Sequence, residues 1–251
     1  MKKIFLYLAV GTLALGSCKK DDDEEVVDVE VDAATQNAYD DEAIVKFLDE
    51  NYLDAKGNIK SFSDDDETDD NYTKLKDLPH ETLASGVVYV VRPDAQPDPG
   101  KTITATDSLK IMVNAVTFKA TKTDDGVAFR SSYPFVNSIA SGNVQSAGKA
   151  DSYYLNYFYV TDKILADYNE KYSTNYTKSY YEIEGFKEAL LKFKSFEKED
   201  SENYNLQGVI IVPSRAAFAK DAHYNYTGIS FKDRSFIFNF QLYNAFTRKK
   251  L

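Results

Sequence analysis

The sequence contains a single cysteine, Cys18, and only two histidines, His80 and His223. One cysteine excludes a disulfide framework, and so few cysteines and histidines argue against a Cys/His zinc site. Tryptophan is absent, and the 11 glycines never fall in the G-x-x-x-x-G-K spacing of a phosphate-binding loop. The abundant residues are aromatic, with 19 Tyr and 16 Phe in 251 residues.

Basic residues are in deficit, with 30 Lys and Arg against 40 Asp and Glu. This balance argues against a sequence-independent nucleic-acid binder, because such a protein needs a basic face. The deficit is uneven: residues 19–85 hold 22 acidic and 7 basic side chains, whereas residues 86–251 hold 18 and 21. The acidity therefore belongs to the N-terminal part, and the rest of the chain is nearly neutral.

No apolar run is long enough to span a membrane. The longest begins the chain, where Lys2 and Lys3 precede the 12 residues Ile4 to Leu15, and a transmembrane helix needs about 20. The run ends in Leu-Gly-Ser-Cys at Cys18, which resembles a bacterial lipobox. The resemblance implies a signal peptide over residues 1–17 and a lipid anchor on Cys18; the alternative is an ordinary secretory signal with an incidental cysteine.

Two lysines and then acidic residues follow the cysteine (Lys19 to Glu25). This run resembles a signal for surface export of lipoproteins, so we expect an outer-membrane lipoprotein exposed at the cell surface, with the periplasmic face as the alternative. Residues 18–39 lack apolar periodicity and are predicted to be a disordered tether.

Residues 40–84 are expected to hold a short helix and an acidic linker. Asp40 to Leu53 has apolar residues at helical spacing, with Asp40 or Asp41 as the N-cap. The charge run Ser61 to Asn71 predicts a loop, and it lacks the glycine and the terminal glutamate of a twelve-residue calcium loop.

Residues 85–251 have the texture of a globular domain. Apolar and alternating patterns predict strands at Val87–Val91, Ser108–Phe118 and Ser235–Leu242, and a helix within Ile183–Phe196. In the last strand Phe236, Phe238, Phe240 and Leu242 share one face, as expected of a half-buried antiparallel strand. Strands, one helix and then strands again predict the α+β class.

Four motifs stand out in this region: Asp125-Gly-Val-Ala-Phe-Arg-Ser-Ser132, Glu182-Ile-Glu-Gly-Phe-Lys-Glu-Ala-Leu190, Ile211-Val-Pro-Ser-Arg-Ala-Ala-Phe-Ala219 and the terminal strand. Together they resemble the FKBP-type peptidyl-prolyl cis-trans isomerases. The resemblance implies an antiparallel sheet of about five strands wrapped around a short helix, here with an insertion over residues 136–180. It implies no cofactor and no metal.

The resemblance also implies a site in which aromatic and aliphatic side chains hold a proline ring. The implied catalytic residues are Phe129, Ile183, Phe186, Phe218 and Phe238, with the backbone N–H of Ile183 as the anchor for a substrate carbonyl. The implied substrate-binding residues are Val113, Arg130 and Ile229. Judged by their spacing alone, the same aromatic residues would be ordinary core.

Three positions depart from the family pattern. Arg130 stands where the family has an aspartate, Phe218 lacks the family's phenol, and Val113 aligns with a tyrosine. These changes remove polar contacts and keep the apolar walls, so we expect proline binding to survive better than catalysis.

Three hypotheses follow. The first is a prolyl isomerase that acts on proline-containing segments of exported proteins; the second is a degenerate FKBP-like domain that binds peptide or serves a surface complex. The third is a glycan-binding lipoprotein, because residues 151–181 contain nine Tyr and Phe158, with a helix predicted at Lys163–Tyr172. Tyrosines stack on sugars and peptides, but they can equally pack an insertion onto a sheet.

Overall fold

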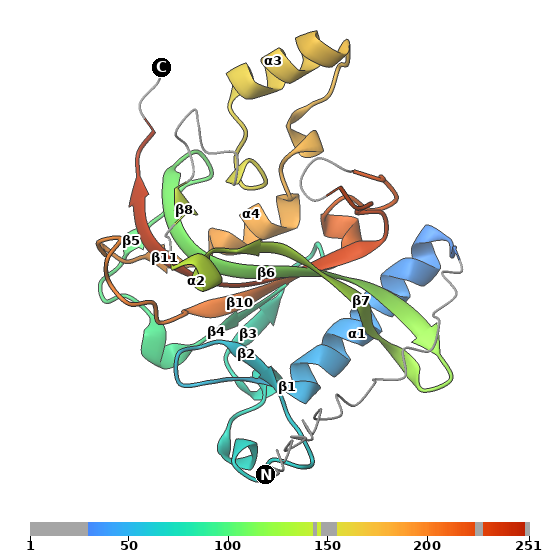
Figure 1. Ribbon diagram of the computed structural model, residues 1–251, viewed down its shortest axis with the longest axis vertical. Helices are drawn as coiled ribbons and strands as arrows, with labels where there is room; N and C mark the ends of the chain where they lie inside the picture. The colour runs from blue at the N-terminus through green and yellow to red at the C-terminus, as the bar shows by residue number, and fades with distance from the viewer. Residues whose placement is uncertain (1–29, 143–144, 147–154, 224–227, 249–251) are drawn as a thin grey trace, which may run out of the picture. The chain divides into compact units, whose positions relative to one another are not determined.

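The centre of the fold is one antiparallel sheet, seen in a computed structural model that describes residues 30–142, 145–146, 155–223 and 228–248. The strands follow the order β3-β4-β10-β11-β6-β7, and β8 pairs with β6 (Figure 1). Their bounds are β3 His80–Thr82, β4 Val88–Val91, β6 Ser108–Thr123, β7 Gly126–Asn137, β8 Gln145–Ser146, β10 Gly208–Val212 and β11 Arg234–Phe246. The predicted α+β class is confirmed, with seven strands where about five were expected.

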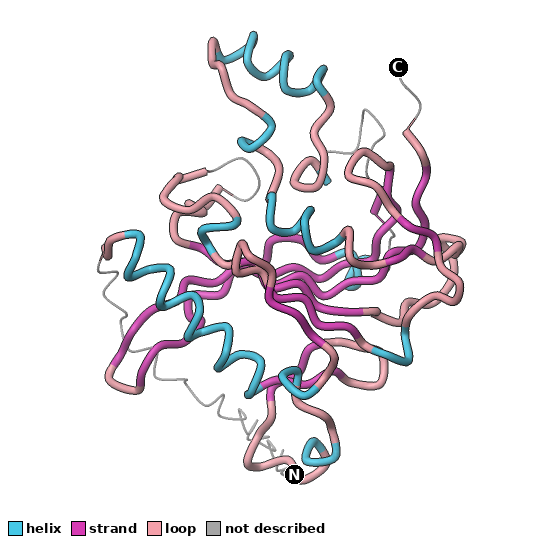
Figure 2. The backbone as a smooth tube through the Cα atoms, turned by 180° about the vertical axis from the view of Figure 1, so that it is seen from behind, coloured by secondary structure: helices cyan, strands magenta, loops and turns pink. Residues whose placement is uncertain are grey.

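Helices cover both faces of this sheet. The long helix α1 (Ala33–Glu50) lies against one face, and the short helix α4 (Glu184–Leu190) lies against the other (Figures 1 and 2). Two further α-helices of the described residues, α2 (Ser138–Ser141) and α3 (Asp162–Tyr172), belong to the insertion between β7 and α4, and α3 confirms the predicted helix there. Helix α4 lies within Ile183–Phe196, where a helix was predicted, and it ends at Leu190.

Side-chain alternation along β11 divides the interior into two apolar cores. Phe236, Phe238 and Phe240 pack in the core under α4, whereas Ile237 packs in the core under α1. The polar Asn239, on the same face as Ile237, is also buried. The prediction of a half-buried strand is therefore wrong, because α1 and the hairpin beside it cover the face that the polar residues suggested was open.

Helix α1 begins earlier than the sequence suggested. Asp32 is its N-cap, with the carboxylate accepting a hydrogen bond from the Thr35 N–H at 2.9 Å, so neither Asp40 nor Asp41 caps the helix. The first residues of α1 lie in the segment 18–39 that was predicted to be a disordered tether. That prediction is wrong from Ala33 onward, because one face of this acidic helix packs on the sheet.

Residues 51–84 are more than a linker. β1 (Asn51–Leu53) and β2 (Ile59–Ser61) form a hairpin, and β3 joins the edge of the main sheet. The described residues from Val31 onward form one compact unit, so the boundary predicted at residue 85 falls inside it. A further small pair, β5 (Lys101–Thr102) with β9 (Lys194–Ser195), lies beside the main sheet.

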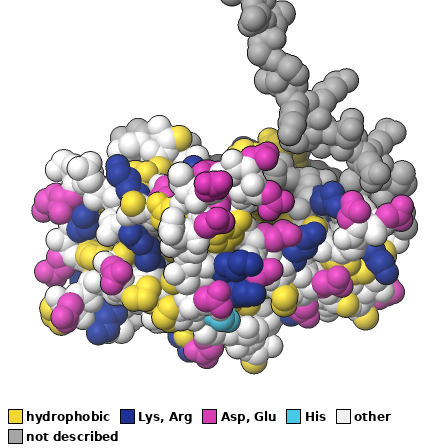
Figure 3. Space-filling view, turned by 90° about the horizontal axis from the view of Figure 1, so that it is seen from below, with side chains coloured by type: hydrophobic (Ala, Val, Ile, Leu, Met, Phe, Trp, Pro, Cys, Tyr) yellow, Lys and Arg dark blue, Asp and Glu magenta, His cyan; other side chains and the backbone are white. Residues whose placement is uncertain are grey.

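Two further features concern the charges on the surface and the length of the helices. Acidic and basic side chains are interspersed on the face drawn in Figure 3, in keeping with the nearly neutral composition of residues 86–251. Among the described residues, no helix combines the length and the apolar character needed to cross a bilayer. The leader, Cys18 and the acidic residues that follow it lie outside the described residues.

Candidate functional site

The site is built around the start of α4, where a glycine lets the helix approach the sheet. A Cβ atom on Gly185 would lie 2.7 Å from Val212 Cγ1 and 2.7 Å from Val87 Cγ2, distances that real Cβ atoms do not show. Only glycine permits this approach. The close contact seats the next residue, Phe186, against the middle of β11, where its ring centroid lies 4.1 Å from that of Phe238.

An aromatic cluster extends from this contact along the α4 side of the sheet. Phe238 lies 6.2 Å from Phe236, and Phe236 lies 6.0 Å from Phe218, measured between ring centroids. Phe218 reaches the cluster from the segment that follows β10 and stacks on Phe231 at 5.6 Å. We call this set of rings, with Phe135 and Tyr157 described below, the α4-side cluster.

Most of the residues implied by the resemblance meet here. Ile183, Phe186, Phe218 and Phe238 all belong to the core that contains the α4-side cluster. The residues assigned to substrate binding divide: Val113 belongs to the same core and Ile229 packs against it, whereas Arg130 lies elsewhere on the sheet. Arg130 donates a hydrogen bond to the Thr123 hydroxyl at 2.9 Å, near the turn of the β6–β7 hairpin.

Phe129 lies on the opposite face of the sheet. It packs with Phe47 of α1 and with Phe118, at centroid distances of 6.1 and 5.6 Å. The cause is an irregularity in β7: Thr117 faces Tyr133 and Lys119 faces Arg130, so β7 carries an extra residue opposite Phe118. Such a bulge reverses which side chains face which core.

Phe135 supplies the ring that β7 gives to the α4-side cluster. Its centroid lies 5.2 Å from Phe236 and 6.1 Å from Phe238. Phe129 and Phe135 are six residues apart, so a regular strand would place both on one face. No short-range sequence pattern separates the two; in the structure the bulge is marked by Ser131, whose φ is positive at 50°.

Tyr157, from the insertion, lies in the middle of the α4-side cluster. Its ring centroid is 5.2 Å from Phe135, 5.5 Å from Phe186 and 5.9 Å from Phe238, on which it stacks. The side chain is 0% exposed, and burial raises the pKa of its hydroxyl far above the usual value. The carbonyl oxygen of Tyr157 accepts a hydrogen bond from the Ile183 N–H at 2.6 Å. The N–H that the resemblance assigns to substrate is thus bound by the chain itself.

Four other tyrosines of the insertion, Tyr168, Tyr172, Tyr176 and Tyr180, form a stack of their own. Tyr176 stacks on Tyr180 at 3.8 Å, and Tyr168 lies against both. Tyr172 and Tyr176 are exposed, at 53% and 42%. Tyr157 cannot contribute to a glycan-binding surface because it is buried. Tyr153, another tyrosine of the insertion, lies outside the described residues. The glycan hypothesis stays a prediction, in which the exposed Tyr172 and Tyr176 would contact the sugar.

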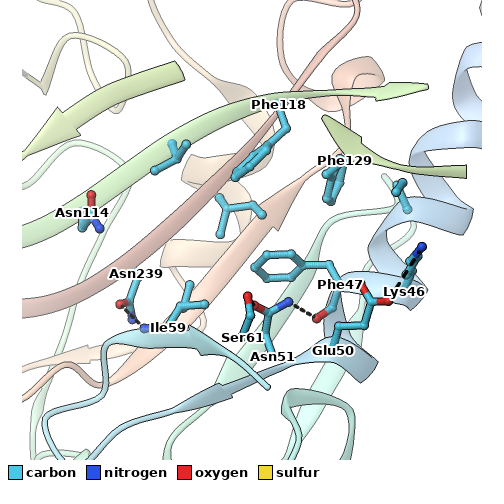
Figure 4. Close-up of a pocket in the computed structure, with 14 residues that line it drawn as sticks. Lys46, Phe47, Glu50, Asn51, Ile59, Ser61, Asn114, Phe118, Phe129 and Asn239 are labelled. Atoms are coloured by element: carbon cyan, nitrogen blue, oxygen red, sulfur yellow. Dashed lines mark hydrogen bonds and ion pairs between the residues drawn. The ribbon is translucent and has the colours of Figure 1, made fainter. Parts of the chain in front are cut away.

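A hollow lies between α1 and the opposite face of the sheet. It has a volume of about 380 Å³ and an apolar floor of Phe47, Phe118 and Phe129 (Figure 4). One of its polar side chains, Asn239, is already hydrogen-bonded: it donates to Gly57 O at 2.9 Å and to Gly208 O at 3.2 Å, and it accepts from the Ile59 N–H at 3.3 Å. Asn239 therefore has no N–H left for a ligand. Within the described residues, no group of three or more His, Cys, Asp or Glu could hold a metal ion.

His223 is buried beside the α4-side cluster, although polar residues surround it in the sequence. Its ring lies 4.4 Å from Phe218 and 4.4 Å from Tyr180. Burial lowers the pKa of His223 from 6.5 to about 4, against an opposing effect of Asp221. His80, by contrast, is exposed.

The His223 imidazole is expected to make stability depend on pH. Its pKa is lower in the folded state than in the unfolded state, so between about pH 6.5 and 4 the unfolded state binds the extra proton. Stability therefore falls as pH falls through this window, by on the order of 1–2 kcal/mol between pH 7 and 5. Urea unfolding at the two pH values should show a smaller loss for His223→Phe than for the wild type; equal losses would contradict the prediction.

Comparison with known proteins gives weak structural similarities. No protein-family model matches the chain, and no curated protein matches it in sequence. Among solved structures, FkpA from Escherichia coli matches with a TM-score of 0.37 and 18% identity over 68% of this chain, which spans only 53% of FkpA. A peptidyl-prolyl cis-trans isomerase from Pseudomonas syringae matches with a TM-score of 0.41 and 13% identity, over 87% of this chain and 99% of that protein.

The N-terminal domain of FKBP42 from Arabidopsis thaliana is similar at a TM-score of 0.39 and 10% identity, over 67% of this chain and 93% of that domain. Similarities of this size decide nothing about function. The function proposed for the chain therefore rests on the residues of the α4-side cluster.

Proposed function

We propose that the α4-side cluster is a peptide-binding site of the FKBP type, which takes proline-containing segments and isomerises the bond before proline weakly. The observation that carries the proposal is the convergence of Ile183, Phe186, Phe218 and Phe238 on one aromatic cluster at the start of a helix. These residues come from three separate sequence motifs, and the fold joins them.

The chemistry requires no nucleophile and no metal. Rotation about a prolyl bond is slow because amide resonance must be broken, at a cost of about 18–20 kcal/mol. An apolar site favours the twisted amide, which is less polar than the planar one. Each 1.36 kcal/mol removed from the barrier gives a tenfold faster reaction. In this chain the rings of Phe186 and Phe238 would enclose the proline, and the Ile183 N–H would hold a substrate carbonyl.

The site is poor in polar groups, and this supports weak rather than strong catalysis. Val113 and Phe218 offer no hydroxyl, and Arg130 lies away from the cluster. An alternative is therefore a degenerate site that binds peptide without accelerating isomerisation, or that serves a partner in a surface complex. With the lipid anchor predicted at Cys18, either site would meet exported proteins at a membrane surface.

The proposal is tested with a protease-coupled assay on an Ala-Pro peptide and with binding of the same peptide. We expect a small acceleration at micromolar protein. Phe218→Tyr restores one hydroxyl, and a hydrogen bond worth about 0.5–1.5 kcal/mol should raise kcat/KM by about 2- to 10-fold. Phe129→Ala is the matched control, because Phe129 packs on the other face and its loss should leave peptide binding unchanged.

The outcomes separate the hypotheses. Binding without acceleration supports the degenerate site. Absence of both in the wild type and in the Tyr157→Ala variant described below removes the proposal. A loss of binding in Phe129→Ala as large as in a variant of the α4-side cluster would place the site elsewhere.

A further inference from the structure

The insertion reaches the interior through a short turn that crosses the α4-side cluster. Leu155, Tyr157, Phe158 and Val160 are all buried, whereas α3, which follows directly, buries none of its residues. The turn is closed by a hydrogen bond from the Phe158 N–H to the Leu155 carbonyl at 2.9 Å. Its tip therefore projects the Tyr157 ring inward.

This turn makes the two kinds of contact that the proposed function assigns to a bound peptide. One ring is enclosed by Phe135, Phe186 and Phe238. One carbonyl, that of Tyr157, accepts from the Ile183 N–H at 2.6 Å. Ile183 is the N-cap residue of α4, so its N–H lies outside the hydrogen-bond ladder of the helix.

The turn is also fixed at its far end. The buried carboxylate of Glu182 accepts from the Val160 N–H at 3.0 Å through one oxygen, and its other oxygen binds the Lys187 ammonium at 2.6 Å. Because Glu182 and Ile183 are adjacent, the first residues of the α4 region hold the turn at two backbone positions. A turn held in this way competes directly with any peptide that needs the same ring space and the same N–H.

We propose that Leu155–Val160 is an internal ligand of the α4-side cluster, which must be displaced before an external peptide binds. The inference rests on the proposed peptide-binding function. An external ligand must take the same ring space and the same N–H as the turn. We therefore expect it to be a peptide turn that carries a ring side chain, and proline is a residue that favours turns. Only the small fraction of molecules in which the turn is displaced can bind such a peptide. The apparent affinity for the peptide is therefore lower than the intrinsic affinity of the open site.

The affinity of an Ala-Pro peptide for the wild type and for Tyr157→Ala tests this directly. Removing the ring vacates the space between Phe135, Phe186 and Phe238, so we expect the dissociation constant to fall at least tenfold. Phe193→Ala is the control, because Phe193 is buried in the same core against Phe240 and lies outside the turn's contacts. It should lose stability without gaining affinity.

A second variant keeps a ring in place. The chain has no tryptophan, so Tyr157→Trp introduces a single reporter whose emission should be that of a buried indole. Saturating Ala-Pro peptide should shift this emission to longer wavelength as the ring is displaced. If the peptide binds wild type and Tyr157→Ala equally and the emission does not move, the internal ligand is refuted while the proposed function stands.

Failure of the proposed function gives a different result, because the Ala-Pro peptide would then bind no variant. In that case a synthetic peptide of residues 155–163 decides the inference. It should raise the Tm of Tyr157→Ala and leave the wild type unchanged, since only the variant has room for a second tyrosine. No shift with this peptide, after no binding of the Ala-Pro peptide, refutes the internal ligand as well.

Discussion

Replacing Phe238 with alanine is expected to lower the free energy of unfolding by about 3–5 kcal/mol, the usual cost of deleting a buried phenylalanine. The ring lies at the centre of the α4-side cluster, within 6.2 Å of Phe135, Tyr157, Phe186 and Phe236. Its removal leaves a cavity that α4 cannot close, because Gly185 already sits against β10. Urea unfolding followed by far-UV circular dichroism measures the loss.

Phe246→Ala is the matched control, because it makes the same change in the same strand. Phe246 is 45% exposed, and the Lys101 ammonium lies 5.7 Å from its ring centroid. The expected loss is below about 1 kcal/mol. Similar losses for the two variants would contradict the assignment of Phe238 to the interior of the cluster.

The sequence correctly predicted those parts of the site that depend on patterns within a few neighbouring residues. Alternation along β11 placed Phe236, Phe238 and Phe240 on one face, and the Glu-Gly-Phe motif placed Phe186 at the start of a helix. Both signals arise within a few residues of chain, where the period of a strand or the close approach of a glycine is fixed. The structure confirms both.

The position of Phe129 was not predictable in the same way. The face on which a strand residue lies depends on every bulge between it and the residues it is compared with. The extra residue of β7 opposite Phe118 becomes visible only when β7 is paired with β6. The motif around Phe129 therefore suggested the right strand and the wrong face.

Long-range contacts account for the remaining differences. Tyr157 looks like any other tyrosine of the insertion, and its burial depends on rings that lie far away in the sequence. His223 sits in a polar stretch and is nevertheless buried against Phe218 and Tyr180. Composition predicted an acidic, solvated N-terminal segment, whereas Asp40 is buried by contact with Ser214, 174 positions away.

Asp40→Ala is expected to lower the free energy of unfolding by about 2–4 kcal/mol. The Asp40 carboxylate accepts hydrogen bonds from the Ser214 N–H at 2.7 Å and the Ser214 hydroxyl at 2.6 Å, and its other oxygen accepts from Gln36 at 3.0 Å. Alanine would leave these buried donors unsatisfied, at about 1–3 kcal/mol for each such group. Burial raises the pKa of Asp40 despite these bonds, so part of their energy offsets the cost of desolvating the charge.

Asp41→Ala is the control, because the neighbouring carboxylate binds the next residue of the same segment. Asp41 pairs with Arg215 at 2.6 Å but is mostly exposed, so its loss should cost less than about 1 kcal/mol. Equal losses would show that the helix charge, rather than the buried bonds to Ser214, holds α1 in place. Ser214 begins the segment that carries Phe218 into the α4-side cluster. Asp40→Ala should therefore also weaken peptide binding in the Tyr157→Ala background, whereas Asp41→Ala should not.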